Sequence, residues 1–250
     1  MMELYNTLLY QPILNLLVYL YNVVPAQEIA LAILALTVIV KVLLYPLTAQ
    51  SLRAQKVMQD LQPKLEALKK QYADNKEKLA TETMALYKEQ KINPLSSCLP
   101  VLIQFPFLIA VYQAFRHGLK SDNLNMLYGF VQNPGTINTM SFGFVDFATP
   151  NIILAVLAGG AQFWQTRMLM RKRPVKKTEA SKDEDMTAVL NRNMLYFMPV
   201  VTIFIGASLP AGLTFYWLIT TLLTIAQQVI IFRPKKTKDT GITEVSGTTV

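Results

Sequence analysis

The chain has 250 residues, of which 52% are apolar and 16% charged, and its mean hydropathy is +0.30, which argues against a soluble domain. The net charge of +8 does not indicate a nucleic-acid partner, because the basic residues cluster in segments that alternate with apolar spans. Cys98 is the only cysteine, which excludes an intrachain disulfide and a cysteine-based metal cluster. We therefore expect an all-α polytopic membrane protein.

The first apolar segment, 4–24, is interrupted by polar residues. Its large aliphatic side chains share one helical face, at Leu9, Ile13, Leu16, Leu17 and Leu20. We predict that residues 1–28 form an extracytoplasmic unit, with an amphipathic helix lying in the outer interface of the membrane. The alternative is a sixth full span, which would move the N-terminus to the cytoplasmic side.

The first predicted span, 29–51, contains a single charge, Lys41. A lysine near the middle of a membrane helix costs about 2.5–3.5 kcal/mol, so it usually marks a hydrated cavity or a partner. Thr37, Tyr45 and Thr48 share the face of Lys41 at helical spacing, which favours a cavity. Alternatively, the flexible lysine side chain snorkels to the headgroups.

Segment 52–92 is rich in charge but keeps a helical repeat of apolar residues, Leu61, Leu65, Leu68 and Tyr72, followed by a turn at 73–75 and a looser repeat. The pattern predicts a cytoplasmic helical hairpin of two mutually packed helices. It is either a mobile arm that meets incoming chains or a partner, or only a spacer.

Four further spans are predicted at 95–115, 147–168, 194–209 and 213–232. Together with the first they make a five-span core at 29–232, followed by a basic, disordered cytoplasmic tail at 233–250. The last two spans form a tight antiparallel pair, because only Pro210, Ala211 and Gly212 remain for the turn.

The distribution of basic residues predicts the orientation. Of the 24 Lys and Arg residues, 21 fall in 52–94, in 167–193 and after 232, whereas the connections on the opposite side hold only Arg116 and Lys120. By the positive-inside rule the N-terminus lies outside and the C-terminus in the cytoplasm.

Polar faces on the other spans match that of Lys41. Side chains with amide, hydroxyl or indole N–H groups recur at helical spacing, at Gln104 in the second span, at Gln162, Gln165 and Thr166 in the third, and at Thr214, Trp217, Thr221, Thr224 and Gln228 in the fifth. We predict a hydrated groove lined by these side chains together with Thr37 and Lys41. The alternative is that the threonines and glutamines only bond neighbouring helices.

Catalytic signatures are missing from the sequence. No span holds a pair of carboxylates, and no HExxH, GxSxG or phosphate-binding glycine loop occurs. We therefore expect no enzymatic activity, no cofactor and no metal. The unequal loops do not show the two matching halves of an inverted-repeat transporter.

Three motifs carry a resemblance: LQPKLEALKKQY in the hairpin, NPLSSCLPVLIQFPFLIAVY entering the second span, and LPAGLTFYWLITTLLTIAQQ across the last two. With this order and spacing, the chain resembles the YidC/Oxa family of membrane protein insertases, in its short bacterial form. The resemblance implies five helices around a hydrophilic groove open to the cytoplasm and the lipid. It also implies that Lys41 stands where the family usually has Arg, and that Gln165 and Trp217 line the groove.

The predicted function is that of an insertase and chaperone in the bacterial cytoplasmic membrane. Its groove hydrates the hydrophilic flank of a nascent membrane protein, and Lys41 attracts acidic residues of that flank. The expected partners are nascent membrane proteins and the lipid bilayer, with a Sec translocon and the ribosome as further candidates and no nucleic-acid specificity. The alternative function is a small-solute transporter or channel.

Overall fold

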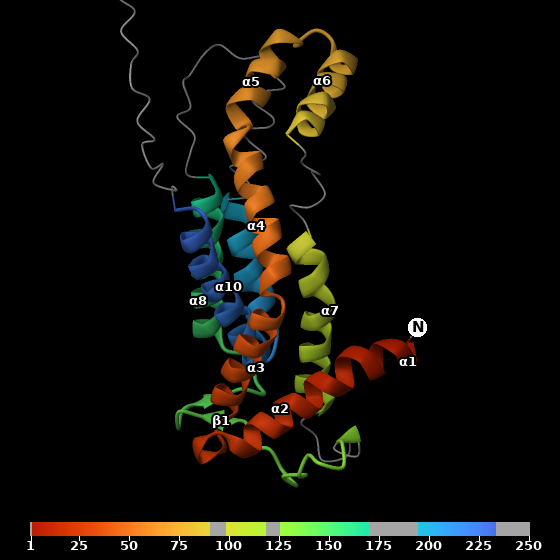
Figure 1. Ribbon diagram of the computed structural model, residues 1–250. Coiled ribbons are helices and arrows are strands. Elements are labelled where there is room, and N and C mark those ends of the chain that lie inside the picture. Colours follow the sequence, from red (N-terminus) through yellow and green to blue (C-terminus); the bar gives the residue numbers. More distant parts are fainter. Residues whose placement is uncertain (1, 91–98, 119–125, 171–194, 234–250) are drawn as a thin grey trace, which may run out of the picture.

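The computed structural model describes residues 2–90, 99–118, 126–170 and 195–233. Within this part the regular secondary structure is helical except for one small hairpin, and a loop leads up to that hairpin from residue 127. Helices α3, α7, α8 and α10 run along a common direction, α2 crosses one end of them, and α5 and α6 project from the other end (Figure 1). The helices of the bundle are α3 Ile29–Leu43, α4 Tyr45–Asp60, α7 Leu99–Gln113, α8 Ile152–Met170, a helix at Leu195–Gly206, and α10 Ala211–Ile231.

The N-terminal segment is helical from Met2 to Val23, as α1 Met2–Tyr5, a π-helical turn Asn6–Tyr10 and α2 Gln11–Val23. Its buried face packs into the main core through Leu14, Leu17, Val18 and Tyr21. The helix crosses the end of the bundle and does not run along it (Figure 1). A short 3-10 turn, Pro25–Gln27, then leads into α3.

One buried amide fastens α2 to the segment that precedes the strands. The Asn15 side chain donates to the Met126 carbonyl at 3.2 Å and accepts from the Tyr128 backbone N–H at 2.6 Å. Asn15→Ala is expected to lower the free energy of unfolding by about 1–3 kcal/mol, because it removes the partner of the Tyr128 N–H, while the Met126 carbonyl keeps its bond from Gln11 Nε2. Thermal unfolding in detergent measures the change, with Asn22→Ala, at an exposed bond to the Gln132 carbonyl, as the milder control.

The first predicted span is broken, so the prediction of a continuous helix over 29–51 is wrong. α3 ends at Leu43, α4 begins at Tyr45, and their axes are bent by 68°. The physical cause is Pro46, which has no N–H to donate to the carbonyl one turn earlier and whose ring crowds that carbonyl. The bend, which we call the elbow, lies one turn after Lys41.

The charged segment forms two helices, α5 Gln62–Gln71 and α6 Lys76–Glu89, which lie side by side beyond α4 (Figure 1). Asn75 caps α6 by accepting from the Lys78 backbone N–H at 2.9 Å. α4 runs through position 52 without a break, so no structural boundary falls where the hairpin was predicted to begin. The predicted hairpin end at 91–92, the start of the second span at 95–98, residue 194 and the tail from 234 lie outside the described residues.

The described helices differ in their ability to cross a bilayer. α10, with 21 residues, is the only one among them that is by itself long and apolar enough, and the bent pair of α3 and α4 passes the same criterion as one unit. The helix Leu195–Gly206 is apolar but shorter. That the chain crosses the membrane five times therefore remains a prediction.

A β-hairpin closes the end of the bundle that α2 crosses. β1 Met140–Ser141 pairs antiparallel with β2 Val145–Asp146. Bonds from Gly212 N to the Phe147 carbonyl and from Ala211 N to the Thr149 carbonyl tie the segment after β2 to the start of α10. The Ala148 backbone N–H donates to Asp146 Oδ1 and holds the pKa of this carboxyl below its usual range.

Candidate functional site

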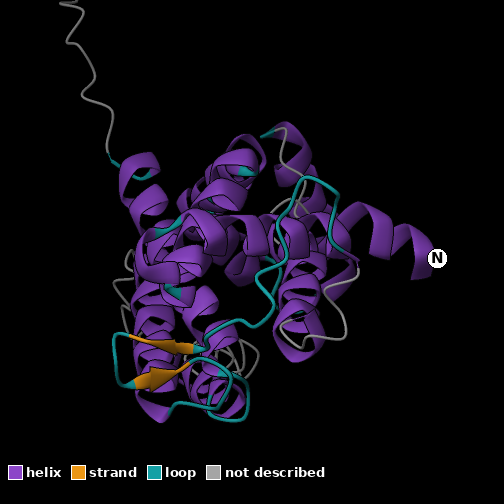
Figure 2. Cartoon of the chain, turned by 90° about the horizontal axis from the view of Figure 1, so that it is seen from below, coloured by secondary structure: helices purple, strands orange, loops and turns teal. Residues whose placement is uncertain are grey.

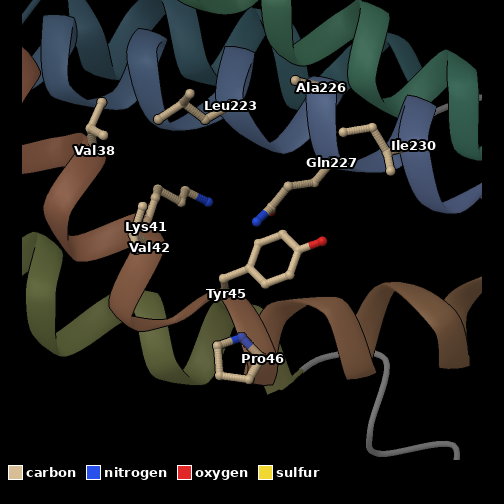
Figure 3. A pocket seen from close by; sticks show the side chains of 9 residues that line it. All are labelled: Val38, Lys41, Val42, Tyr45, Pro46, Leu223, Ala226, Gln227 and Ile230. Carbon is tan, nitrogen blue, oxygen red and sulfur yellow. The ribbon is translucent and has the colours of Figure 1, made fainter.

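A pocket of about 350 Å³ lies between the elbow and α10. Its walls come from α3, the start of α4 and the second half of α10, and Lys41 and Gln227 point toward one another across it (Figure 3). We call it the elbow pocket; its lining residues are Val38, Lys41, Val42, Tyr45, Pro46, Leu223, Ala226, Gln227 and Ile230. Most of the wall is apolar, so the polar groups of Lys41 and Gln227 dominate its chemistry.

Lys41 is buried, with 8% of its surface exposed. Its Nζ donates to the Thr224 hydroxyl at 2.8 Å, and that hydroxyl donates to the Thr220 carbonyl at 2.8 Å. Lys41 forms no ion pair with any residue that the structure describes. A buried cation held by a neutral hydroxyl is poorly compensated, so water or an anionic group would stabilise it strongly.

Two further polar contacts join α10 to its neighbours. The Gln104 side chain on α7 donates to the Tyr216 hydroxyl, and Gln227 Nε2 lies 3.5 Å from the Thr48 hydroxyl on α4, at the outer limit for a hydrogen bond. The face of α10 toward α3, α4 and α7 therefore carries Tyr216, Thr220, Thr224 and Gln227. Tyr216 and Gln227 were not among the residues predicted from the sequence. The four residues of this face are nevertheless spaced by four, four and three positions, which is an equally good helical stripe.

Several predicted groove residues bond within their own helix. The Thr37 hydroxyl donates to the Ile33 carbonyl and the Thr221 hydroxyl to the Trp217 carbonyl, while Thr214 donates to the Gly206 carbonyl in the preceding helix. Trp217 and the two glutamines of α8, Gln162 and Gln165, are half-buried, and no described hydrogen bond joins them to Lys41. Of the predicted set, only Thr224 bonds Lys41 directly.

Buried amide atoms near the pocket lack protein partners. Gln227 Oε1 and both side-chain amide atoms of Gln228 are buried and have no hydrogen-bond partner among the described residues. Such atoms are the usual sites of internal water, because an unsatisfied buried amide is costly. Gln227 lines the elbow pocket together with Lys41, so its unpaired oxygen provides a place for water there. No group of three or more His, Cys, Asp or Glu residues in the described part of the chain is placed to hold a metal ion.

A family model and individual relatives of known name both point to the same protein family. The family model described as 60Kd inner membrane protein matches residues 19–239. The membrane protein insertase YidC of Haemophilus influenzae Rd is 32% identical over 223 residues, which cover 89% of this chain and 36% of that protein. The Fusobacterium nucleatum protein of the same name is 32% identical over 203 residues, which cover 81% of this chain and 85% of that protein.

A solved structure shares the fold. The crystal structure of an active YidC insertase, with its first transmembrane domain resolved, matches 92% of this chain and 47% of that chain with a TM-score of 0.55 and 24% identity. The chain spans only about 36% of the length of the Haemophilus relative, whereas it spans most of the Fusobacterium one.

Proposed function

Since the chain belongs to the 60 kDa inner membrane protein family, whose members include the YidC insertases, we propose that it inserts nascent membrane proteins into a bacterial cytoplasmic membrane and assists their folding. The observation that carries this proposal is Lys41: a buried cation on an apolar helix, with a neutral hydroxyl as its partner and a pocket in front of it. Such a cation attracts acidic groups that pass it and keeps water in its surroundings.

We propose that the protein crosses the membrane five times around a hydrophilic groove, with its N-terminus outside and its C-terminus in the cytoplasm. α10 supports it, because its 21 residues extend about 31 Å at 1.5 Å per residue, close to the roughly 30 Å of a hydrocarbon core. The excess of Lys and Arg in the segments assigned to the cytoplasm supports the orientation. In this arrangement residues 1–28 lie in the outer interface, and α5 and α6 form a cytoplasmic arm.

In the proposed mechanism the hydrophilic flank of a substrate enters the groove from the cytoplasm. Lys41 binds its acidic residues, and Thr37, Gln104, Gln162, Gln165, Trp217, Thr221 and Thr224 line the hydrated path. The apolar segment of the substrate then leaves into lipid, and its transfer from water supplies the driving force without a nucleotide. The protein acts by lowering a barrier and makes no covalent change.

Reconstitution tests the function directly. Purified protein in liposomes is expected to insert a short single-span substrate in the absence of ATP, measured by protease protection of the translocated flank. Liposomes without the protein, and liposomes with heat-inactivated protein, are the controls. A preparation that inserts nothing but conducts ions or accumulates a solute would contradict the proposal and favour a channel or transporter. Adding a Sec translocon or ribosomes to the same assay then tests these two candidate partners.

A further inference from the structure

The turn between β1 and β2 presents two aromatic rings to the outside. Phe142 is 53% exposed and Phe144 is 79% exposed, and the segment 139–145 contains no charged residue. Seen from the end of the bundle, the hairpin lies at the edge of the molecule with its turn facing outward (Figure 2). We call Phe142, Gly143 and Phe144 the hairpin tip.

The backbone of the tip does not suit its sequence. Phe142 has φ of 56° and Gly143 has φ of 76°, and the Phe144 N–H bonds the Ser141 carbonyl at 3.4 Å, which are features of a type I′ turn. The first central position of this turn favours Asn, Asp or Gly, and a bulky residue at positive φ is strained. The exposed Phe142 ring recovers little of that cost by packing inside the chain, so a contact outside the chain is expected to compensate for it.

Hydrogen bonds fix where the tip lies relative to the spans. The Ser141 hydroxyl is buried and accepts from the Ala30 backbone N–H at 3.2 Å, and the Phe142 N–H lies 3.3 Å from Glu28 Oε2. Glu28 and Ala30 lie at the N-terminus of α3. The tip is therefore held level with the N-terminal end of that helix. The exposed apolar surface of α8 begins close by in the chain, at Ile152 and Ile153.

We propose that the hairpin tip inserts into the outer interface of the bilayer and sets the height of α3 and α8 within it. Aromatic residues are favoured where polar headgroups meet the acyl chains, and the tip is bonded to the carboxylate of Glu28, directly before the first residue of α3. The tip carries no charge, and the exposed residues Ile152 and Ile153 at the start of α8 follow it closely in the chain, which favours a lipid surface over a protein partner. This inference rests on the span arrangement proposed above.

Tryptophan reporters in liposomes test the proposal on the full chain. In a background with Trp164→Phe and Trp217→Phe, single reporters are placed at the tip by Phe142→Trp or Phe144→Trp. Ile153→Trp on α8, 68% exposed, is the lipid-facing reference, and Met84→Trp on α6, 54% exposed, is the matched reference in water. Quenching is measured with phospholipids brominated near the headgroup and with aqueous iodide.

We expect brominated lipid to quench both tip reporters about twofold more than the α6 reporter, and iodide to quench them correspondingly less. Quenching of the tip by iodide alone, with Ile153→Trp still quenched by lipid, overturns the proposal and leaves the span arrangement standing. Protection of the tip from both quenchers indicates cover by protein and also overturns it. Failure of lipid to quench Ile153→Trp overturns the span arrangement itself. Two tip positions are used so that a folding defect at one leaves the other as the test.

Discussion

Lys41→Ala is expected to reduce the insertion of substrates with acidic flanks about tenfold in liposomes, which corresponds to the loss of one charge-assisted hydrogen bond of about 1.4 kcal/mol. The reason is that Lys41 is a buried cation whose only described hydrogen-bond partner is the hydroxyl of Thr224, so its charge remains available to an anion. Substrates with neutral flanks are expected to lose much less. The measurement is the initial rate of protease-protected product for a matched pair of substrates that differ only in the acidic residues.

Two variants separate charge from geometry at this site. Lys41→Arg keeps the cation and is expected to retain most of the activity, since the elbow pocket of about 350 Å³ has room for the larger head group. Thr224→Val removes the hydroxyl partner but keeps the charge, and it should affect acidic and neutral substrates alike and mildly. An equal loss for both substrates in Lys41→Ala would show that the lysine maintains the pocket and does not attract the flank.

Gly159→Ala is expected to destabilise the protein by about 1–3 kcal/mol, because α8 packs directly against the helix Leu195–Gly206 at this position. A Cβ at Gly159 would overlap the Ile203 side chain and lie 3.0 Å from the Pro199 carbonyl oxygen. The cost is seen as a lower midpoint of thermal unfolding in detergent, followed by circular dichroism.

The neighbouring glycine supplies the control. A Cβ at Gly160 would meet no atom within 4 Å, and Gly160→Ala is expected to leave stability unchanged or raise it by up to about 1 kcal/mol through better helix propensity. If both variants unfold at the same temperature, the two helices are not in the close contact described here. Insertion activity measured in parallel shows whether this packing also matters for function.

The sequence predicted the helical content, the turn at 73–75 and the family, and the comparisons confirm the membership. These features depend on local periodicity and on motif order, which are visible without a fold. Pro46 within the apolar run is a sequence signal for the elbow. The length of the apolar segment nevertheless favoured a single span, and the bend was not predicted. The last two helices are close together as predicted, since Thr214 bonds back to the Gly206 carbonyl, but the turn lies at 207–210, because Ala211 and Gly212 already belong to α10.

The sequence limits the candidate partners of Lys41 on the last span to a few polar residues, but it does not show which of them contacts the lysine. Two stripes on the last span, one through Thr221 and Gln228 and one through Thr220 and Gln227, have nearly the same spacing, and Thr224 lies between them. Helical periodicity defines the angle between two side chains on one helix but not the rotation of that helix against its neighbours. Only the packing of α10 against α3, α4 and α7 decided that Thr224 meets Lys41 and that Gln227 faces the elbow pocket.

The sequence by itself thus determined a helical membrane chain with a single cation, Lys41, in its first apolar helix, because composition and charge distribution are properties of the chain order alone. The tertiary structure alone decided what surrounds that cation, and it alone brought the strained tip at Phe142 beside Glu28. Both depend on contacts between residues more than 100 positions apart, whose geometry is set by how whole helices and strands pack and leaves no periodic signal in the sequence.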